Sequence, residues 1–223
     1  MKRSEINREI RAAEAFFSSL GFQLPKFAFW TPEEWAGHGP EIREIYDCNL
    51  GWDVTDFGRG DFRRAGLLLF TIRNGVAGST RYPKAYAEKI MISRSEQKTL
   101  MHCHEKKCED IINRGGGKLV FELYNRKSPG ERELADTPVE LVRDGERIIV
   151  QPGAKLVLSP GESITLTPNL FHAFYAEKGA DVMIGEVSSV NDDRADNVFY
   201  QPQRRFPLIE EDEPPYRKMV GDY

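Results

Sequence analysis

The chain has 223 residues, of which 40% are hydrophobic and 30% are charged, a composition typical of a folded globular protein. Its 31 Lys and Arg residues stand against 35 Asp and Glu residues, which gives a formal charge of -4. We therefore expect no nucleic-acid partner, because no basic excess is available to neutralise a phosphate backbone. The apolar runs, such as residues 65–72, are much shorter than the roughly 20 residues that a membrane helix requires, so no membrane association is expected.

The start of the chain and its cysteines both favour a reducing compartment. Residues 1–11 are rich in charge and no apolar core follows them, which does not fit a secretory signal peptide. The three cysteines, Cys48, Cys103 and Cys108, form an odd set whose spacing fits neither a disulfide framework nor a zinc ribbon. We therefore expect a cytoplasmic protein with free thiols.

The first 50 residues have helical patterns. Apolar side chains recur at three- and four-residue spacing, with Ser4 as the expected N-cap and Gly21 just past the end; they are Ile6, Ile10, Ala13, Phe16, Phe17 and Leu20. The segment Thr31-Pro32-Glu33-Glu34 combines an N-cap, a first-turn proline and a capping-box glutamate. It predicts a second helix, which residues 37–40 interrupt and residues 41–46 resume.

After Trp52 the pattern changes to short runs that are rich in β-branched, aromatic or other apolar residues. These runs are 67–72, 86–92, 119–124, 139–143, 147–150, 164–167, 171–176 and 182–187. Asp144-Gly145 lies between two of them and predicts a type I′ hairpin, and Lys178-Gly179 lies similarly between the last two. The sequence therefore predicts a mostly β fold, an antiparallel sandwich or small barrel with the N-terminal helices packed on it.

Residues 201–223 hold four prolines and the acidic run 210–213, and we interpret them as an extended tail laid over the barrel. The acidic run has two open interpretations, a solvated surface and a functional role. No internal repeat or linker divides the chain. We therefore expect a single domain with a helical arm at 1–50, a barrel at 51–200 and the tail at 201–223.

Three of the four histidines lie in two predicted β segments. On a strand, His102 and His104 point to the same face, so that two imidazoles can bind one ion. Glu109 has the opposite parity, and a turn or bulge at residues 105–108 must re-aim it. The Lys106-Lys107 pair makes a surface turn plausible there.

His102, His104, Glu109 and His172 together predict a metal site. They offer three nitrogens and one carboxylate oxygen, which leaves two positions of an octahedral ion open. Open positions indicate catalysis rather than a structural role. A lone His-x-His pattern is usually only exposed or hydrogen-bonded strand histidine, but the spaced glutamate and the later strand histidine favour the metal interpretation.

These residues carry a resemblance to the cupin superfamily. His102-x-His104-x4-Glu109-x6-Gly116 resembles the first cupin motif, and Gly161-x6-Pro168-x3-His172 resembles the second. The resemblance implies a small antiparallel β barrel (jelly roll) whose ligands converge inside it. The sequence also departs from the usual motifs: Glu96 replaces an opening glycine, the spacing before His172 is one residue shorter and lacks its glycine, and Ala176 replaces a closing asparagine. The turns beside the ligands are therefore expected to differ.

Segments 109–117, 185–193 and 205–213 resemble more specifically the D-lyxose isomerase family of this superfamily, and the likeness extends from the N-terminal helices to the tail. The resemblance implies a divalent ion, most often manganese, and interconversion of D-lyxose and D-xylulose. D-mannose has the same configuration at C2 and C3, so conversion of D-mannose to D-fructose is a second expected reaction. Small cupins commonly pair, and a closed dimer is the commonest assembly, so we expect a homodimer.

Aldose–ketose isomerisation moves a proton between C1 and C2, and a cation bound to the two sugar oxygens would stabilise the enediolate. A partly buried carboxylate can carry the proton. Glu186 is the first candidate, because a hairpin around Lys178-Gly179 would place it roughly opposite His172. Lys89 is expected to bind a substrate hydroxyl or the oxyanion. Glu109 and the acids of 210–213 remain open alternatives for the base.

Two other functions use the same ligand set and remain open. One is a non-haem iron dioxygenase, and the other is a non-catalytic sugar-binding cupin whose metal only holds the barrel together. One fold carries all of these functions, so the metal motif alone does not choose between them.

Overall fold

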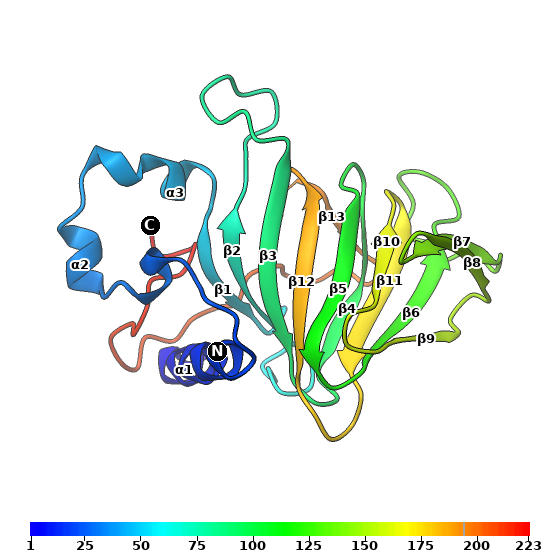
Figure 1. The fold of residues 1–223 in the computed structure, drawn as a ribbon, viewed down its shortest axis with the longest axis horizontal. Helices are drawn as coiled ribbons and strands as arrows, with labels where there is room; N and C mark the ends of the chain where they lie inside the picture. The colour runs from blue at the N-terminus through cyan, green and yellow to red at the C-terminus, as the bar shows by residue number, and fades with distance from the viewer. Residues whose placement is uncertain (194) are drawn as a thin grey trace.

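The computed structural model describes residues 1–193 and 195–223. Two antiparallel sheets face each other, and the helices pack at one end of the larger sheet (Figure 1). The helices are α1 (Arg3–Ser19), η1 (Lys26–Phe29), α2 (Pro32–Ala36), η2 (Pro40–Ile42) and α3 (Arg43–Asp47). None of the helices in the described residues has the length and hydropathy that a membrane crossing needs.

The larger sheet has eight strands within the described residues and the smaller has five. In spatial order, the larger is β1 (Gly51–Thr55), β2 (Leu67–Arg73), β3 (Tyr86–Ser93), β12 (Val182–Ser189), β5 (Glu109–Gly116), β10 (Ser163–Leu166), β7 (Val139–Arg143) and β8 (Glu146–Val150). The smaller is β13 (Asn197–Phe199), β4 (Lys98–His104), β11 (Leu170–Ala176), β6 (Leu119–Asn125) and β9 (Lys155–Leu158). The predicted mostly β fold with N-terminal helices is confirmed.

Two hydrophobic cores hold these layers together. The core between the sheets includes Met91 and Ile184 from the larger sheet and Phe121 from the smaller. The second core lies between α1 and the outer face of β1 to β3, where Phe17 stacks on Trp52 at a ring-centroid distance of 6.4 Å. The predicted apolar stripe of α1 supplies the helix side of this second core, which fixes the helical arm to the barrel.

One predicted hairpin is confirmed and the other is wrong. Asp144 and Gly145 have φ angles of 49° and 88° and join β7 to β8, as a type I′ turn requires. The turn at 178–179 instead carries the chain from β11 in the smaller sheet to β12 in the larger. Both strands have an apolar face, and crossing between the sheets buries both faces in the same core.

The helix signals were also partly right. Thr31 and Glu34 form the expected capping box at the start of α2. The Ser4 prediction is wrong, because α1 begins at Arg3 and the Ser4 hydroxyl donates to Asp212 at 2.6 Å. A partner from the far end of the chain has replaced the local cap.

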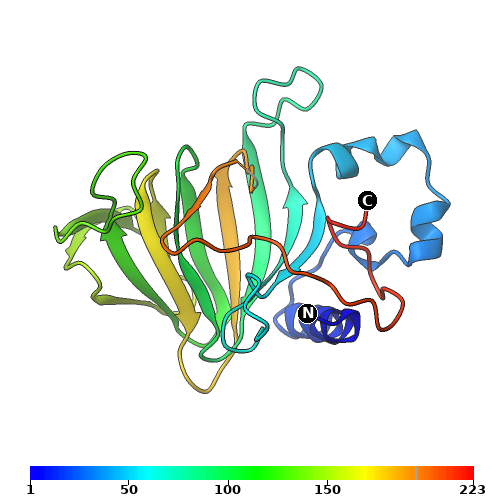
Figure 2. The same cartoon turned by 180° about the vertical axis from the view of Figure 1, so that it is seen from behind.

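Residues 201–223 run past the barrel and then along α1 and β1 (Figure 2). The acidic run contacts the first turns of α1: Glu211 pairs with Arg3 at 2.7 Å and Glu213 accepts from Asn7 at 2.6 Å. Arg3 also pairs with Asp222 at 2.8 Å. The run therefore fastens the tail to α1, and the suggestion that one of its acids covers the barrel mouth as a base is wrong.

Candidate metal centre and active site

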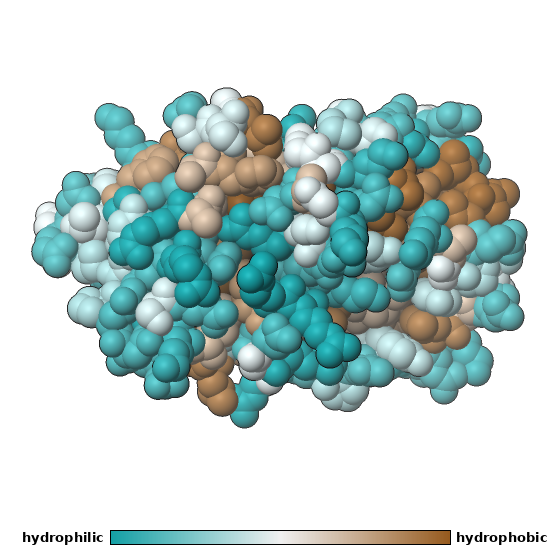
Figure 3. Space-filling view, turned by 90° about the horizontal axis from the view of Figure 1, so that it is seen from below, coloured by the Kyte–Doolittle hydropathy of each residue, from teal (hydrophilic) through white to brown (hydrophobic). Residues whose placement is uncertain are grey.

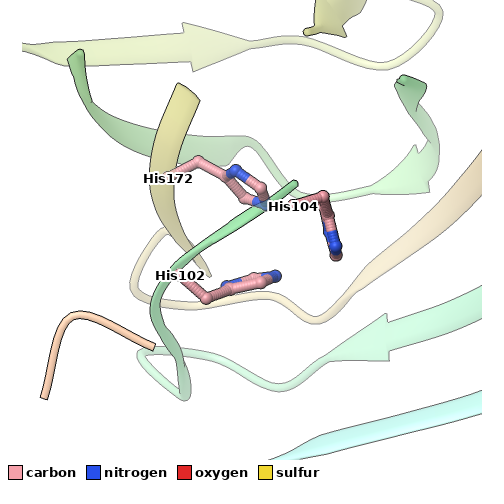
Figure 4. A group of neighbouring side chains, drawn as sticks. All are labelled: His102, His104 and His172. Carbon is pink, nitrogen blue, oxygen red and sulfur yellow. The ribbon is translucent and has the colours of Figure 1, made fainter. Parts of the chain in front are cut away.

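Three histidine rings converge between the sheets (Figure 4). His102 and His104 alternate along β4, and His172 on β11 lies directly opposite His102 in the antiparallel ladder. One ring nitrogen from each side chain lies within 4.8 Å of the others. The strand parity that the sequence predicts is what brings the first two rings to one face.

Hydrogen bonds fix the tautomers of two of these rings. Nδ1 of His102 lies 2.7 Å from the Leu100 carbonyl oxygen, and Nδ1 of His172 lies 3.0 Å from that of Leu170. A carbonyl oxygen can only accept, so each Nδ1 carries the proton and each Nε2 keeps a free lone pair. Backbone partners of this kind orient histidines that bind metals.

Burial keeps the His102 and His104 rings neutral. Loss of hydration holds the pKa of His102 well below its ordinary value, and burial also lowers the pKa of His104. Nδ1 of His104 is buried without a hydrogen-bond partner in the described residues. Neutral imidazoles are the form that binds a cation.

Glu109 reaches the same point from the opposite sheet. The chain turns at residues 105–108, and Glu109 then opens β5. Its Oε1 lies 3.4 Å from Nε2 of His104 and 3.3 Å from Nε2 of His172. Burial alone would raise the pKa of Glu109, but Lys107 and His104 outweigh it and hold that pKa well below the usual range. Three imidazole nitrogens and an ionised carboxylate fit a divalent ion.

A buried group of charges lies beside this cluster. Glu186 on β12 is the cross-strand partner of Lys89 on β3, and Nζ of Lys89 lies 3.2 Å from its Oε1. Nζ of Lys107 lies 2.9 Å from the same Oε1 and 2.5 Å from Oε2 of Glu109. The two lysines and two carboxylates thus alternate in sign, which is how buried charges are tolerated.

The charge network continues to the tail. Asp193 lies 3.8 Å from Nζ of Lys89 and accepts from Nη2 of Arg205 at 2.9 Å. The same Nη2 donates to Asp53 on β1 at 2.7 Å. Nη1 of Arg205 is buried and has no hydrogen-bond partner in the described residues. A cationic donor therefore remains free beside the pocket.

All six residues singled out from the sequence line one pocket: Lys89, His102, His104, Glu109, His172 and Glu186. Its wall also includes apolar side chains such as Leu69, Met91 and Phe174. Glu186 arrives there from the sheet opposite His172, not from the hairpin that the sequence suggested.

Sequence reasoning missed Lys107, Asp193 and Arg205, which line the same pocket. Lys107 was part of a pair interpreted as a surface turn, yet only Lys106 is exposed and Lys107 is buried. Asp193 and Arg205 lie in segments that carried the family resemblance, and that location was the available signal.

Comparison with known proteins identifies the family of the chain. The profile described as D-lyxose isomerase matches residues 1–223. The chain belongs to the D-lyxose isomerase family. It is 50% identical to a D-lyxose/D-mannose isomerase of Escherichia coli O157:H7 and 48% identical to one of Serratia proteamaculans, in each case over all of this chain and 98% of the relative.

Solved structures of other isomerases share the family fold. A mutant L-ribose isomerase of Acinetobacter sp. DL28 in complex with L-ribose superposes with a TM-score of 0.63 at 14% identity, and one of Cellulomonas parahominis with L-psicose gives 0.62 at 14% identity. Both matches cover 94% of this chain and 98% of the other chain. At this identity the likeness concerns the fold alone.

Proposed function

We propose that the protein is a metal-dependent aldose–ketose isomerase that interconverts D-lyxose with D-xylulose and D-mannose with D-fructose. The observation that carries this proposal is the convergence of three imidazoles and Glu109 beside the buried Glu186 and its two lysines. The names of the two relatives, which both include D-lyxose and D-mannose, support the choice of sugars.

His102, His104, Glu109 and His172 would hold the ion, and we propose manganese, the ion that the resemblance to the D-lyxose isomerase family implies. When bound, such an ion acts as a Lewis acid on a neighbouring carbonyl group and lowers the cost of removing the adjacent proton. The donors come from both sheets, so the protein fixes their positions before the ion arrives.

The remaining steps belong to side chains of the chain itself. We assign the Glu186 carboxylate to carry the proton between C1 and C2 of the open-chain sugar, since it is buried at the pocket and is not one of the proposed ligands. We assign Lys89 and Lys107 to donate to an oxygen that gains negative charge. Glu109 remains the alternative base.

Arg205 is suited to bind the sugar chain. Its Nη2 is committed to Asp53 and Asp193, whereas its Nη1 is buried and has no partner in the described residues. A buried unpaired donor costs about 1–3 kcal/mol, and a substrate hydroxyl would relieve that cost. We therefore assign Nη1 to a hydroxyl away from the reacting carbons.

We also propose that the chain folds as one domain, forms a homodimer and works in the cytoplasm. Cys48 and Cys103 are buried free thiols, and burial raises the pKa of Cys103 to about 12, which suits a reducing compartment. A single unfolding transition and a light-scattering mass of twice the chain mass are the expected results. Two transitions, or a monomeric mass, would contradict these assignments.

The test of the function combines metal analysis with an isotope experiment. Purified protein is expected to contain about one manganese per chain after loading, to convert D-lyxose and D-mannose, and to lose activity with a chelator. Turnover in D₂O should place deuterium at the transferred carbon position. Turnover without deuterium would oppose proton transfer. Loss of activity under strict anaerobiosis would favour the dioxygenase instead.

A further inference from the structure

Asn191, in the segment that follows β12, touches both lysines of the charge network. We propose that Asn191 is a positioning residue whose side-chain oxygen holds Lys89 and Lys107 on Glu186, and that Asn74 locks Asn191 in place. This inference rests on the proposed function, because it concerns how the Glu186 carboxylate, the proposed proton-transfer group, is held in position.

The geometry around the amide oxygen is specific. Oδ1 of Asn191 accepts from Nζ of Lys89 at 2.7 Å and lies 3.4 Å from Nζ of Lys107. Oε1 of Glu186 lies 3.2 Å from the first ammonium group and 2.9 Å from the second. Two cations therefore share the same pair of oxygens, one from a carboxylate and one from a neutral amide.

That second acceptor helps to hold two cations in one place. Two ammonium groups this close repel each other, and the repulsion is strong because both side chains are buried. The carboxylates of Glu186 and Glu109 offset it, and the Asn191 oxygen gives Lys89 a further acceptor at 2.7 Å. Without Asn191, Lys89 keeps only Glu186 at 3.2 Å and Asp193 at 3.8 Å as oppositely charged neighbours, so it can move toward Asp193.

Asn74 explains why the Asn191 oxygen stays in place. It is buried, and its side chain forms a closed pair of hydrogen bonds with the backbone of residue 191: Oδ1 accepts from N of Asn191 and Nδ2 donates to its O, both at 3.0 Å. Nδ2 also donates to the Cys48 carbonyl oxygen at 3.2 Å. The loop that carries Asn191 is thereby tied to β2 and to the end of α3.

This arrangement separates positioning from binding. Asn191 contacts the groups that are proposed to act on the sugar, but it is not one of the proposed metal ligands. Its loss should therefore lower kcat while KM and metal content change little. Loss of a hydrogen bond to a charged group corresponds to about a tenfold to hundredfold rate change.

The decisive experiment compares Asn191→Leu with Asn191→Asp in the metal-loaded protein. Leucine has a similar shape but no acceptor, and we expect kcat for D-lyxose to fall about tenfold to hundredfold with KM within about threefold. Aspartate keeps the acceptor oxygen, and we expect it to retain kcat within about fivefold of the parent. Asn125→Leu is the matched control, since this half-buried asparagine bonds Thr137 and Pro138 away from the pocket.

Equal losses in the leucine and aspartate variants, or unchanged kcat in a folded leucine variant, would overturn the proposal. Asn74→Ala is expected to reproduce the leucine effect, and combining the two should add little, because both act through the same oxygen.

A crystal structure of the metal-loaded Asn191→Leu protein gives a readout independent of turnover. Lys89 should leave Glu186 there. If the parent protein lacks isomerase activity but Lys89 is displaced in the variant, the proposed function is wrong and the positioning role of Asn191 is supported.

Discussion

The five-stranded sheet contributes three imidazoles to the pocket, whereas the facing eight-stranded sheet contributes Glu109, Glu186 and Lys89. The first set can bind a cation only when neutral, and the second set works only when charged. Burial serves both: it lowers the pKa of His102 and His104 on one side, and it strengthens the ion pairs on the other.

The surface of the molecule differs from this buried site. Figure 3 shows the molecule from below, with hydrophilic and hydrophobic residues interspersed over most of that face. The charges that matter for the proposed chemistry are instead buried, with Lys89 and Glu109 each 3% exposed. Net charge and surface polarity are therefore poor guides to the function of this chain. Of the four predictions that follow, three test the different roles of the two sheets and the last tests a turn that joins them.

Removing a donor from the five-stranded sheet should have the largest effect. We expect His172→Ala to lose the metal and at least about a thousandfold in kcat/KM, because the Lewis acid contributes several kcal/mol. Metal content and turnover are measured on the same preparation. His38→Ala removes the fourth histidine, which lies in the helical arm beside Glu41, and should leave both unchanged. Retained metal in His172→Ala would argue against the assigned ligand set.

Changing the eight-stranded sheet should separate chemistry from metal binding. Glu186→Gln keeps the shape of the side chain but removes the proposed base, and we expect kcat to fall by about 10² to 10⁴ with the metal retained. The measurement is steady-state turnover of D-lyxose together with metal analysis. A variant with normal turnover would transfer the base role to Glu109 or support a non-catalytic protein.

The two sheets should also respond to acid in different pH windows. The lowered pKa values of His102 and His104 mean that the native metal-free protein resists protonation. Below pH of about 6.5 the unfolded chain takes up protons that the native state does not, so stability falls as pH falls. The expected loss is up to about 1.4 kcal/mol per pH unit for each histidine between pH 6.5 and 5.

Denaturant unfolding of chelator-treated protein checks this slope. His102→Leu should make the unfolding free energy fall less steeply between pH 6.5 and 5. It should leave unchanged the loss of stability at lower pH that comes from Glu109. The pKa of Glu109 is lowered, so its carboxylate stabilises the native state above pH of about 4.5 and loses that contribution only below it. A flat profile between pH 6.5 and 5 for the parent protein would contradict the neutral-imidazole description.

The smallest expected effect concerns a turn that joins the sheets. Glu96 lies between β3 and β4 with a φ of 64°, in the left-handed region that favours glycine. Its side chain is exposed, so it contributes little to stability that would offset this backbone strain. Glu96→Gly should raise the unfolding free energy by about 0.5 to 1 kcal/mol, measured in urea. Glu105→Gly, at another exposed position, should show no gain.

Part of the fold and of the site could be predicted from the sequence. Parity along one strand placed His102 and His104 together, and composition and turn residues gave the β-rich fold with its N-terminal helices. The direction of the Glu109 side chain depends on the turn at residues 105–108, whose shape the sequence did not predict. This turn carries the chain to the other sheet. Lys107 could not be separated from Lys106 by any local pattern, since only tertiary packing buries one of them.

The wrong predictions, the Ser4 N-cap and the hairpin at Lys178-Gly179, have the same physical cause. Ser4 had a good local signal, but Asp212 from the tail bonds its hydroxyl. Lys178-Gly179 looked like Asp144-Gly145, but the apolar faces of the flanking strands pack across the core instead of along one ladder. Arg205 likewise reaches the pocket from beyond the last strand. Contacts between distant segments decide these features, and a local pattern does not contain them.

The repeated crossing of the chain between sheets has a kinetic consequence. β3, β4, β5 and β6 alternate between the two sheets, so neither sheet can be completed by consecutive strands. β12 must find β3, which pairs Val182 with Ser93 although the strands β4 to β11 lie between them in the sequence. Such long-range pairing slows folding to milliseconds or longer. The cation-binding donors meet only when both layers have closed, so the rate at which refolding chains acquire metal affinity should report the final assembly event.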